Sequence, residues 1–167
     1  YEFSNKVSQF IEQRNSSELN TSELFSLVTK LESENSHLEF IKNLSKMKIQ
    51  DRTLLYEIVD DHVNGVPTSL DKTLKDIYDN NRVRLIKFRE LAEKSNILFE
   101  LDYVTLGESR FANDFTLNLT SKAVDLIFQE DAVLFQQNKK YKNAIFNEDI
   151  VAKELFYGGQ LADEINF

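Results

Sequence analysis

Several residue types are scarce in this chain. Cysteine and tryptophan are absent, and the 167 residues include one proline, one methionine and four glycines. Without cysteine the chain can form no disulfide framework, no thiolate metal site and no cysteine nucleophile, and it suits a reducing compartment. The glycines are Gly65, Gly107, Gly158 and Gly159. None lies in a Gly-x-x-x-x-Gly-Lys-Ser/Thr run, so the sequence contains no phosphate-binding loop of that type.

Long apolar stretches are also missing. No apolar run approaches the roughly 20 residues that a membrane-spanning helix needs. The N-terminus does not show a basic region followed by an apolar stretch, which is the pattern of a secretory signal. We therefore expect a cytoplasmic protein that makes no membrane contact.

Basic residues are outnumbered by acidic ones. The chain has 20 Lys and Arg residues against 28 Asp and Glu residues, for a formal net charge of −8. A field of that sign repels phosphate backbones and anionic lipids over about one Debye length, roughly 10 Å. The charge disfavours nucleic acid as a partner and favours protein.

The hydrophobic content of 41% is enough to bury a core. The spacing of apolar residues along residues 1–48 predicts N-terminal helices that pack on this core. The helical patterns lie at residues 2–14, 21–31 and 38–44. We expect Thr21 or Ser22 to cap the second of these helices, because either side chain can accept a bond from an unpaired amide of the first turn.

The order of helix and strand patterns in residues 49–130 predicts a winged-helix-like domain. Helical patterns lie at residues 50–64, 68–78 and 82–94, and strand patterns at 99–103 and 115–119. Three helices followed by a two-stranded antiparallel ribbon is the order of a winged helix. The predicted fold class is therefore α+β, mainly α, and a helical domain with an inserted hairpin is the alternative.

Single residues mark the ends and the buried sides of these elements. Gly65 is expected to end its helix in the left-handed conformation, Thr68 to cap the next helix, and Thr120 to cap a helix after the ribbon. The helix at 50–64 is expected to bury His62. The helix at 82–94 groups Leu85, Phe88, Leu91 and Ala92 on one side.

Three stretches carry a resemblance to a known family. They are Leu54–Gly65, Phe115–Ala123 and Lys153–Tyr157. Over roughly residues 21–167 the chain resembles the winged-helix-like region that precedes the ATPase core in AAA+ ATPases. In that family a stretch like the third one leads into the nucleotide-binding domain, so the resemblance implies that residues 131–167 are a linker toward a C-terminal ATPase domain.

The resemblance concerns mainly the parent protein. The chain opens at Tyr1 without an initiator methionine and stops at Phe167 in what reads as the first turn of another helix, so we expect a piece of a longer protein. ATP and Mg²⁺ are expected in the C-terminal domain alone, and any oligomer would form through the parent ATPase. No ATPase residue can be assigned to this chain.

The sequence shows no arrangement suited to catalysis or metal binding. Asp60, Asp61 and His62 are consecutive, and consecutive helical residues point about 100° apart, so they cannot converge on one ion. Serine catalysis needs a base and an orienting group, but the chain has two histidines and no Gly-x-Ser-x-Gly elbow. We predict no catalytic, cofactor-binding or metal-binding residues.

The alternative function is DNA binding, because the third helix of many winged helices enters the major groove. The candidate nucleic-acid contacts are Arg82, Arg84, Lys87, Arg89 and Arg110. Projected at 100° per residue, the helical ones form no single basic stripe, because acidic residues share their sides. We therefore favour a non-catalytic accessory domain of an AAA+ ATPase that contacts protein partners or positions the ATPase core, by analogy with other winged helices that lack a basic reading helix.

Overall fold

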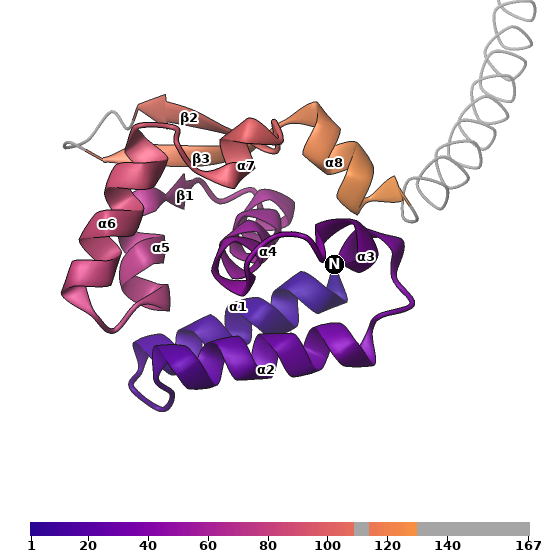
Figure 1. The fold of residues 1–167 in the computed structure, drawn as a ribbon, viewed down its shortest axis with the longest axis horizontal. Helices are drawn as coiled ribbons and strands as arrows, with labels where there is room; N and C mark the ends of the chain where they lie inside the picture. The colour runs from indigo at the N-terminus through magenta and orange to yellow at the C-terminus, as the bar shows by residue number, and fades with distance from the viewer. Residues whose placement is uncertain (109–113, 130–167) are drawn as a thin grey trace, which may run out of the picture. The chain divides into compact units, whose positions relative to one another are not determined.

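The computed structural model describes residues 1–108 and 114–129 (Figure 1). Its elements are α1 (Glu2–Asn15), α2 (Thr21–Glu34), α3 (Glu39–Leu44), α4 (Ile49–Asn64), β1 (Thr68–Ser69), α5 (Leu70–Ile77), α6 (Asn81–Ala92), α7 (Ile97–Glu100), β2 (Val104–Glu108), β3 (Phe115–Leu119) and α8 (Ser121–Ile127). Residues 1–126 form one compact unit. The fold is α+β and mainly α, which confirms the predicted class. The predicted linker at 131–167 lies outside the described residues.

The strands form one antiparallel sheet in the order β1-β3-β2. β3 pairs with β2 along its length, from Val104 opposite Leu119 to Glu108 opposite Phe115. β1 adds two residues to the other edge of β3, with Thr68 opposite Leu117. The predicted two-stranded ribbon is therefore a three-stranded sheet. A strand of two residues is too short to show alternation in the sequence.

The first strand of the ribbon begins later than the sequence predicts. Residues 99–103 are not a strand, because the chain first forms the short helix α7 and β2 begins at Val104. Asn96 starts α7, and its Oδ1 accepts a hydrogen bond from the amide of Leu98 at 3.0 Å. Asp102, with φ of 57°, then turns the chain into β2. The alternation of apolar residues here comes from a helical turn followed by a left-handed residue.

Of the four predicted caps, two are confirmed and two lie one residue away from their predicted places. Gly65 ends α4 in the left-handed conformation with φ of 69°. The Oγ1 of Thr120 accepts from the amide three residues later at 3.2 Å, at the start of α8. Thr68, predicted to cap α5, instead lies in β1, and Ser69 is the cap, accepting from the amide three residues on at 3.2 Å. The pairing of Thr68 with β3 therefore moves the cap by one residue.

The cap of α2 is also one residue from its predicted place. Asn20, not Thr21 or Ser22, accepts from the amide of Glu23 at 2.9 Å, and the Glu23 carboxylate accepts from the amide of Asn20 at 2.8 Å. This is a reciprocal capping box. We expect Asn20→Ala to lower the free energy of unfolding by about 1 kcal/mol and Ser22→Ala by less than about half of that. Urea denaturation of the two variants measures the difference, and equal losses would contradict this assignment.

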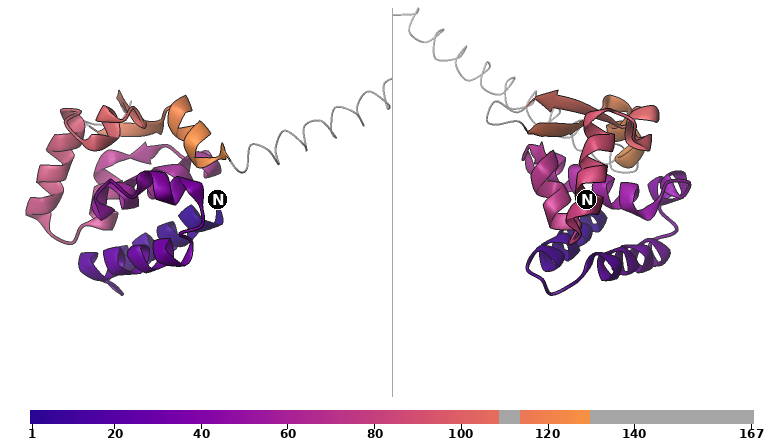
Figure 2. Two further views of the ribbon diagram at one scale, coloured as in Figure 1. Left: turned by 45° about the vertical axis from the view of Figure 1, so that its right-hand side comes forward. Right: turned by 60° about the vertical axis from the view of Figure 1, so that its left-hand side comes forward.

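α4 lies between the α1–α2 pair and the sheet (Figures 1 and 2). The ring of Phe3 on α1 packs edge-on against Tyr56 of α4, with ring centroids 4.8 Å apart. Arg14, at the buried end of α1, donates to the carbonyl oxygens of Lys75 and Asp76, the second at 2.6 Å. These bonds satisfy carbonyls in the last turn of α5. The N-terminal helices thus pack directly on the winged-helix-like core.

One predicted core residue is wrong. His62 is exposed, because the last turn of α4 extends beyond the packed helices, and its residues from Asp61 to Asn64 are exposed or half-buried. The order α4, β1, α5, α6, α7, β2, β3 is that of a winged helix with the short helix α7 added before β2, and α6 occupies the place of the third helix (Figure 1). Among the helices of residues 1–108 and 114–129, none combines the length and apolar character that a bilayer crossing demands.

Candidate interaction surface

α6 buries little of its own surface. Leu91 is its one buried residue. Leu85, Ile86 and Val83 leave 67%, 50% and 39% of their surface exposed. The helix is nevertheless well formed, since the side chain of Asn80 accepts from two amides of its first turn, at 2.9 and 3.2 Å. α6 is therefore a stable helix that presents apolar side chains to solvent.

The predicted apolar side of α6 requires correction at Leu85. α6 packs on α5, and Phe88 reaches the ring of Phe115 on β3, with centroids 6.1 Å apart. Leu91 is fully covered and Phe88 is half-buried. Leu85 lies one turn nearer the start of the helix and about 60° around the axis from Phe88. That rotation takes its side chain off the core.

We call Arg82, Leu85, Ile86 and Arg89 the outer face of α6. Arg82 precedes Leu85 and Ile86 by three and four residues, and Arg89 follows them by four and three. Residues at these spacings are neighbours on a helix surface. The outer face is therefore an exposed aliphatic pair with a guanidinium group at each end.

The arginines of α6 differ in their ionic partners. Arg89 pairs with Glu93 through Nε and Oε1 at 2.8 Å, and its side chain is 78% exposed. Arg82 is exposed, and no carboxylate of residues 1–108 or 114–129 lies within ion-pair distance of it. Arg84 is half-buried. Arg110, the fifth candidate nucleic-acid contact, lies outside the described residues.

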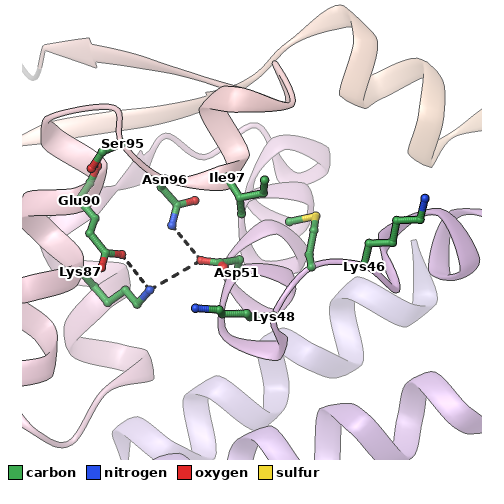
Figure 3. Close-up of a pocket in the computed structure, with 9 residues that line it drawn as sticks. Lys46, Lys48, Asp51, Lys87, Glu90, Ser95, Asn96 and Ile97 are labelled. Carbon is green, nitrogen blue, oxygen red and sulfur yellow. Dashed lines mark hydrogen bonds and ion pairs between the residues drawn. The ribbon is translucent and has the colours of Figure 1, made fainter.

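Lys87 turns inward, toward a pocket between α6 and the start of α4 (Figure 3). The pocket has a volume of about 350 Å³ and is lined by Lys46, Met47, Lys48, Asp51, Lys87, Glu90, Ser95, Asn96 and Ile97. The Nζ of Lys87 lies 2.8 Å from Glu90 and 3.9 Å from Asp51. Asn96 donates to the same oxygen of Asp51 at 2.9 Å. Both carboxylates are therefore paired, and the network holds the inner side of α6 against α4.

A second group of charged side chains lies on α4 and α5. Glu57 and Asp60 are 8% and 6% exposed, and one carboxylate oxygen of each has no hydrogen-bond partner in the described part of the chain. Burial, reinforced by the negative charge of Asp61, raises the pKa of Glu57 to about 7. Asp60 is buried and His62 is exposed, the reverse of the burial expected for His62. Within residues 1–108 and 114–129 no three His, Cys, Asp or Glu side chains are grouped as metal ligands.

The sequence interpretation missed the apolar residues of the outer face, although a signal for them exists. At 100° per residue, Val83, Leu85, Ile86 and Leu91 point in four different directions. A helix packed on one side cannot bury all four against one core. Some of them had to face solvent, and the contacts of α5 and β3 decide which.

The exposure of Leu85 and Ile86 has a direct consequence for stability. We expect Leu85→Ser and Ile86→Ser each to change the free energy of unfolding by less than about 0.5 kcal/mol, because surface substitutions remove no packed contact. Thermal or urea denaturation measures this. A loss of about 2 kcal/mol would mean that these side chains are covered within the protein.

A scan against protein-family models finds no matching family, and searches of curated proteins and of solved structures find no match. The similarity to AAA+ ATPases therefore stays a prediction from the sequence.

Proposed function

We propose that this chain is a non-catalytic protein-interaction domain and that the outer face of α6 is its contact surface. The observation that supports this most is the exposure of Leu85 and Ile86, at 67% and 50%. Complete burial of such a side chain contributes about 1.5–3 kcal/mol. Binding of a partner that covers both side chains would therefore be stabilised by hydrophobic burial that folding of the described residues does not provide. An apolar centre with charged residues at its rim is also the usual anatomy of a protein interface.

Nucleic acid is a poorer fit to the same helix. Base edges are read by polar and charged side chains, and nonspecific affinity comes from cations near phosphates. On α6 the exposed arginines Arg82 and Arg89 flank two exposed aliphatic side chains, and Lys87 is engaged with Asp51 and Glu90. The net charge of −8 adds a repulsive field. DNA binding therefore remains the second candidate.

We further propose that this domain belongs to a cytoplasmic AAA+ ATPase. The winged-helix order and the stretches Leu54–Gly65, Phe115–Ala123 and Lys153–Tyr157 support this. ATP and Mg²⁺ would then bind in a separate domain, and oligomers would form through that domain. A Gly-x-x-x-x-Gly-Lys-Ser/Thr motif after Phe167 in the parent sequence would strengthen the proposal. A parent without this motif would remove its main support.

Site-specific photo-crosslinking tests the contact surface. A benzophenone amino acid replaces Ile86 in the protein as expressed in its own cells, and the same group replaces exposed Thr29 on α2 as the matched control. We expect crosslinks to protein from position 86, and their loss when Leu85→Ser is added. Crosslinks to nucleic acid alone from position 86, or equal protein crosslinks from both positions, would contradict the proposal.

A further inference from the structure

The outer face of α6 also indicates the chemistry of its partner, an inference that rests on the proposed function. α6 carries four basic residues and one acidic residue, a local excess of three positive charges on a chain whose net charge is −8. Arg82 has no ion-pair partner within residues 1–108 and 114–129. Arg89 pairs with Glu93 in a surface pair between side chains that are 78% and 57% exposed. Such pairs contribute about 0.3–0.5 kcal/mol and are readily exchanged.

A second copy of the chain is not the expected occupant. A two-fold contact places the same patch of both copies together. Two outer faces would then bring guanidinium groups of like charge to the rim of one interface, which opposes association. The charge of α6 is instead complementary to an acidic surface.

We propose that the partner of α6 is an acidic amphipathic protein segment. Its apolar side chains cover Leu85 and Ile86, and its carboxylates pair with Arg82 and Arg89. A guanidinium group binds a carboxylate with two parallel hydrogen bonds, which fixes orientation as well as sign. The distance between the two arginines is seven residues, or two helical turns, about 10 Å along the axis. A helical partner would meet this spacing with carboxylates seven residues apart on either side of its apolar stripe.

The basic residue on the inner side of α6 is already engaged in ion pairs, so we expect the partner to bind the outer face. Lys87 is held by Glu90 at 2.8 Å and approaches Asp51, whose oxygen also accepts from Asn96 at 2.9 Å. A carboxylate arriving at the pocket would meet Asp51 and Glu90 beside the lysines that line it, and Lys87 is already engaged with both of these carboxylates. At the outer face it meets two guanidinium groups, of which Arg89 alone is paired with a carboxylate, that of Glu93, within residues 1–108 and 114–129.

The test uses the whole ¹⁵N-labelled chain and three synthetic helical peptides, followed by amide chemical shifts. One peptide has leucines on one side and glutamates along the flanks of that stripe. The second replaces every glutamate with lysine, and the third has the composition of the first in scrambled order. We expect the first peptide to shift amides of α6, and the second and third to leave them unchanged.

Charge-reversed variants provide the matched control. Arg82→Glu with Arg89→Glu should weaken binding of the acidic peptide by about tenfold or more. Lys6→Glu with Lys30→Glu makes the same change in net charge at exposed sites on α1 and α2 and should leave affinity within about twofold. Absence of shifts with the acidic peptide, or equal weakening by both double variants, overturns this inference. If the lysine peptide alone shifts α6, the partner chemistry is wrong while the protein-contact function stands.

Discussion

Glu32→Ala is expected to lower the free energy of unfolding by about 3 kcal/mol, the lower end of the cost of breaking a buried ion pair. Glu32 on α2 is 8% exposed. Its two oxygens accept from Arg52 Nε and Nη2 at 2.7 and 2.8 Å, and the hydroxyl of Tyr56 donates to one of them at 2.8 Å. Loss of the carboxylate leaves Nε and Nη2 of the largely buried guanidinium, and the buried hydroxyl of Tyr56, without their acceptor, while Nη1 keeps its bond to the carbonyl oxygen of Met47. The bond to Glu32 raises the pKa of Arg52 in the folded protein. Without that bond the guanidinium still carries its charge, because arginine is not deprotonated in proteins.

Glu34→Ala is the matched control for this effect. Glu34 lies two residues further along α2 and is exposed, so its removal should cost less than about 0.5 kcal/mol. Urea denaturation of both variants at neutral pH gives the comparison. Similar losses at the two positions would show that the network between α2 and α4 contributes little.

Glu57→Gln is expected to stabilise the protein at pH 8 and to have little effect at pH 5. The folded-state pKa of Glu57 is about 7, above the ordinary value of 4.5, because burial and then the charge of Asp61 disfavour its ionised form. Asp60 adds to this effect, and Ser8 and Lys72 oppose it. Below pH 4.5 both states hold the proton. Between pH 4.5 and 7 the unfolded chain loses the proton first, so stability falls as pH rises.

The expected size of this pH effect follows from the difference between the folded-state and ordinary pKa values of Glu57. Above pH 7 the buried carboxylate costs at most about 3 kcal/mol, and the neutral amide of glutamine removes that cost. We expect a gain of about 1–3 kcal/mol at pH 8, measured by urea denaturation across pH. Glu12→Gln, at an exposed position of α1, should show no such dependence. A variant at Glu57 that is destabilised at pH 8 would mean that its carboxylate makes a favourable ionic contact.

The sequence predicts most helices because their ends carry local chemistry. Gly65 and Thr120 act within one turn of their own positions, and they end α4 and begin α8 as predicted. The strand at 99–103 was wrong because Asn96 starts a helical turn there, whereas the cap at Thr68 was wrong for a non-local reason. Thr68 pairs with Leu117 in β3, a contact between residues far apart in the chain, and no local pattern contains it.

The candidate site was less predictable than the fold. The charges of α6 can be counted from the sequence, but the inward turn of Lys87 depends on Asp51 of another helix. Likewise, Leu85 is as apolar as Leu91, and only packing against α5 and β3 separates the exposed residue from the buried one. Local periodicity identifies a helix, whereas tertiary contacts decide which of its sides remains available.

Titration of the chain into a fluorescent random-sequence DNA duplex tests most directly whether α6 serves protein or nucleic acid. At about 50 mM salt, where backbone contacts are strong, we expect no saturable change in anisotropy up to about 100 μM protein. Micromolar binding that weakens with added salt and is lost in Arg82→Glu with Arg89→Glu, but kept in Leu85→Ser with Ile86→Ser, would contradict the protein-contact function.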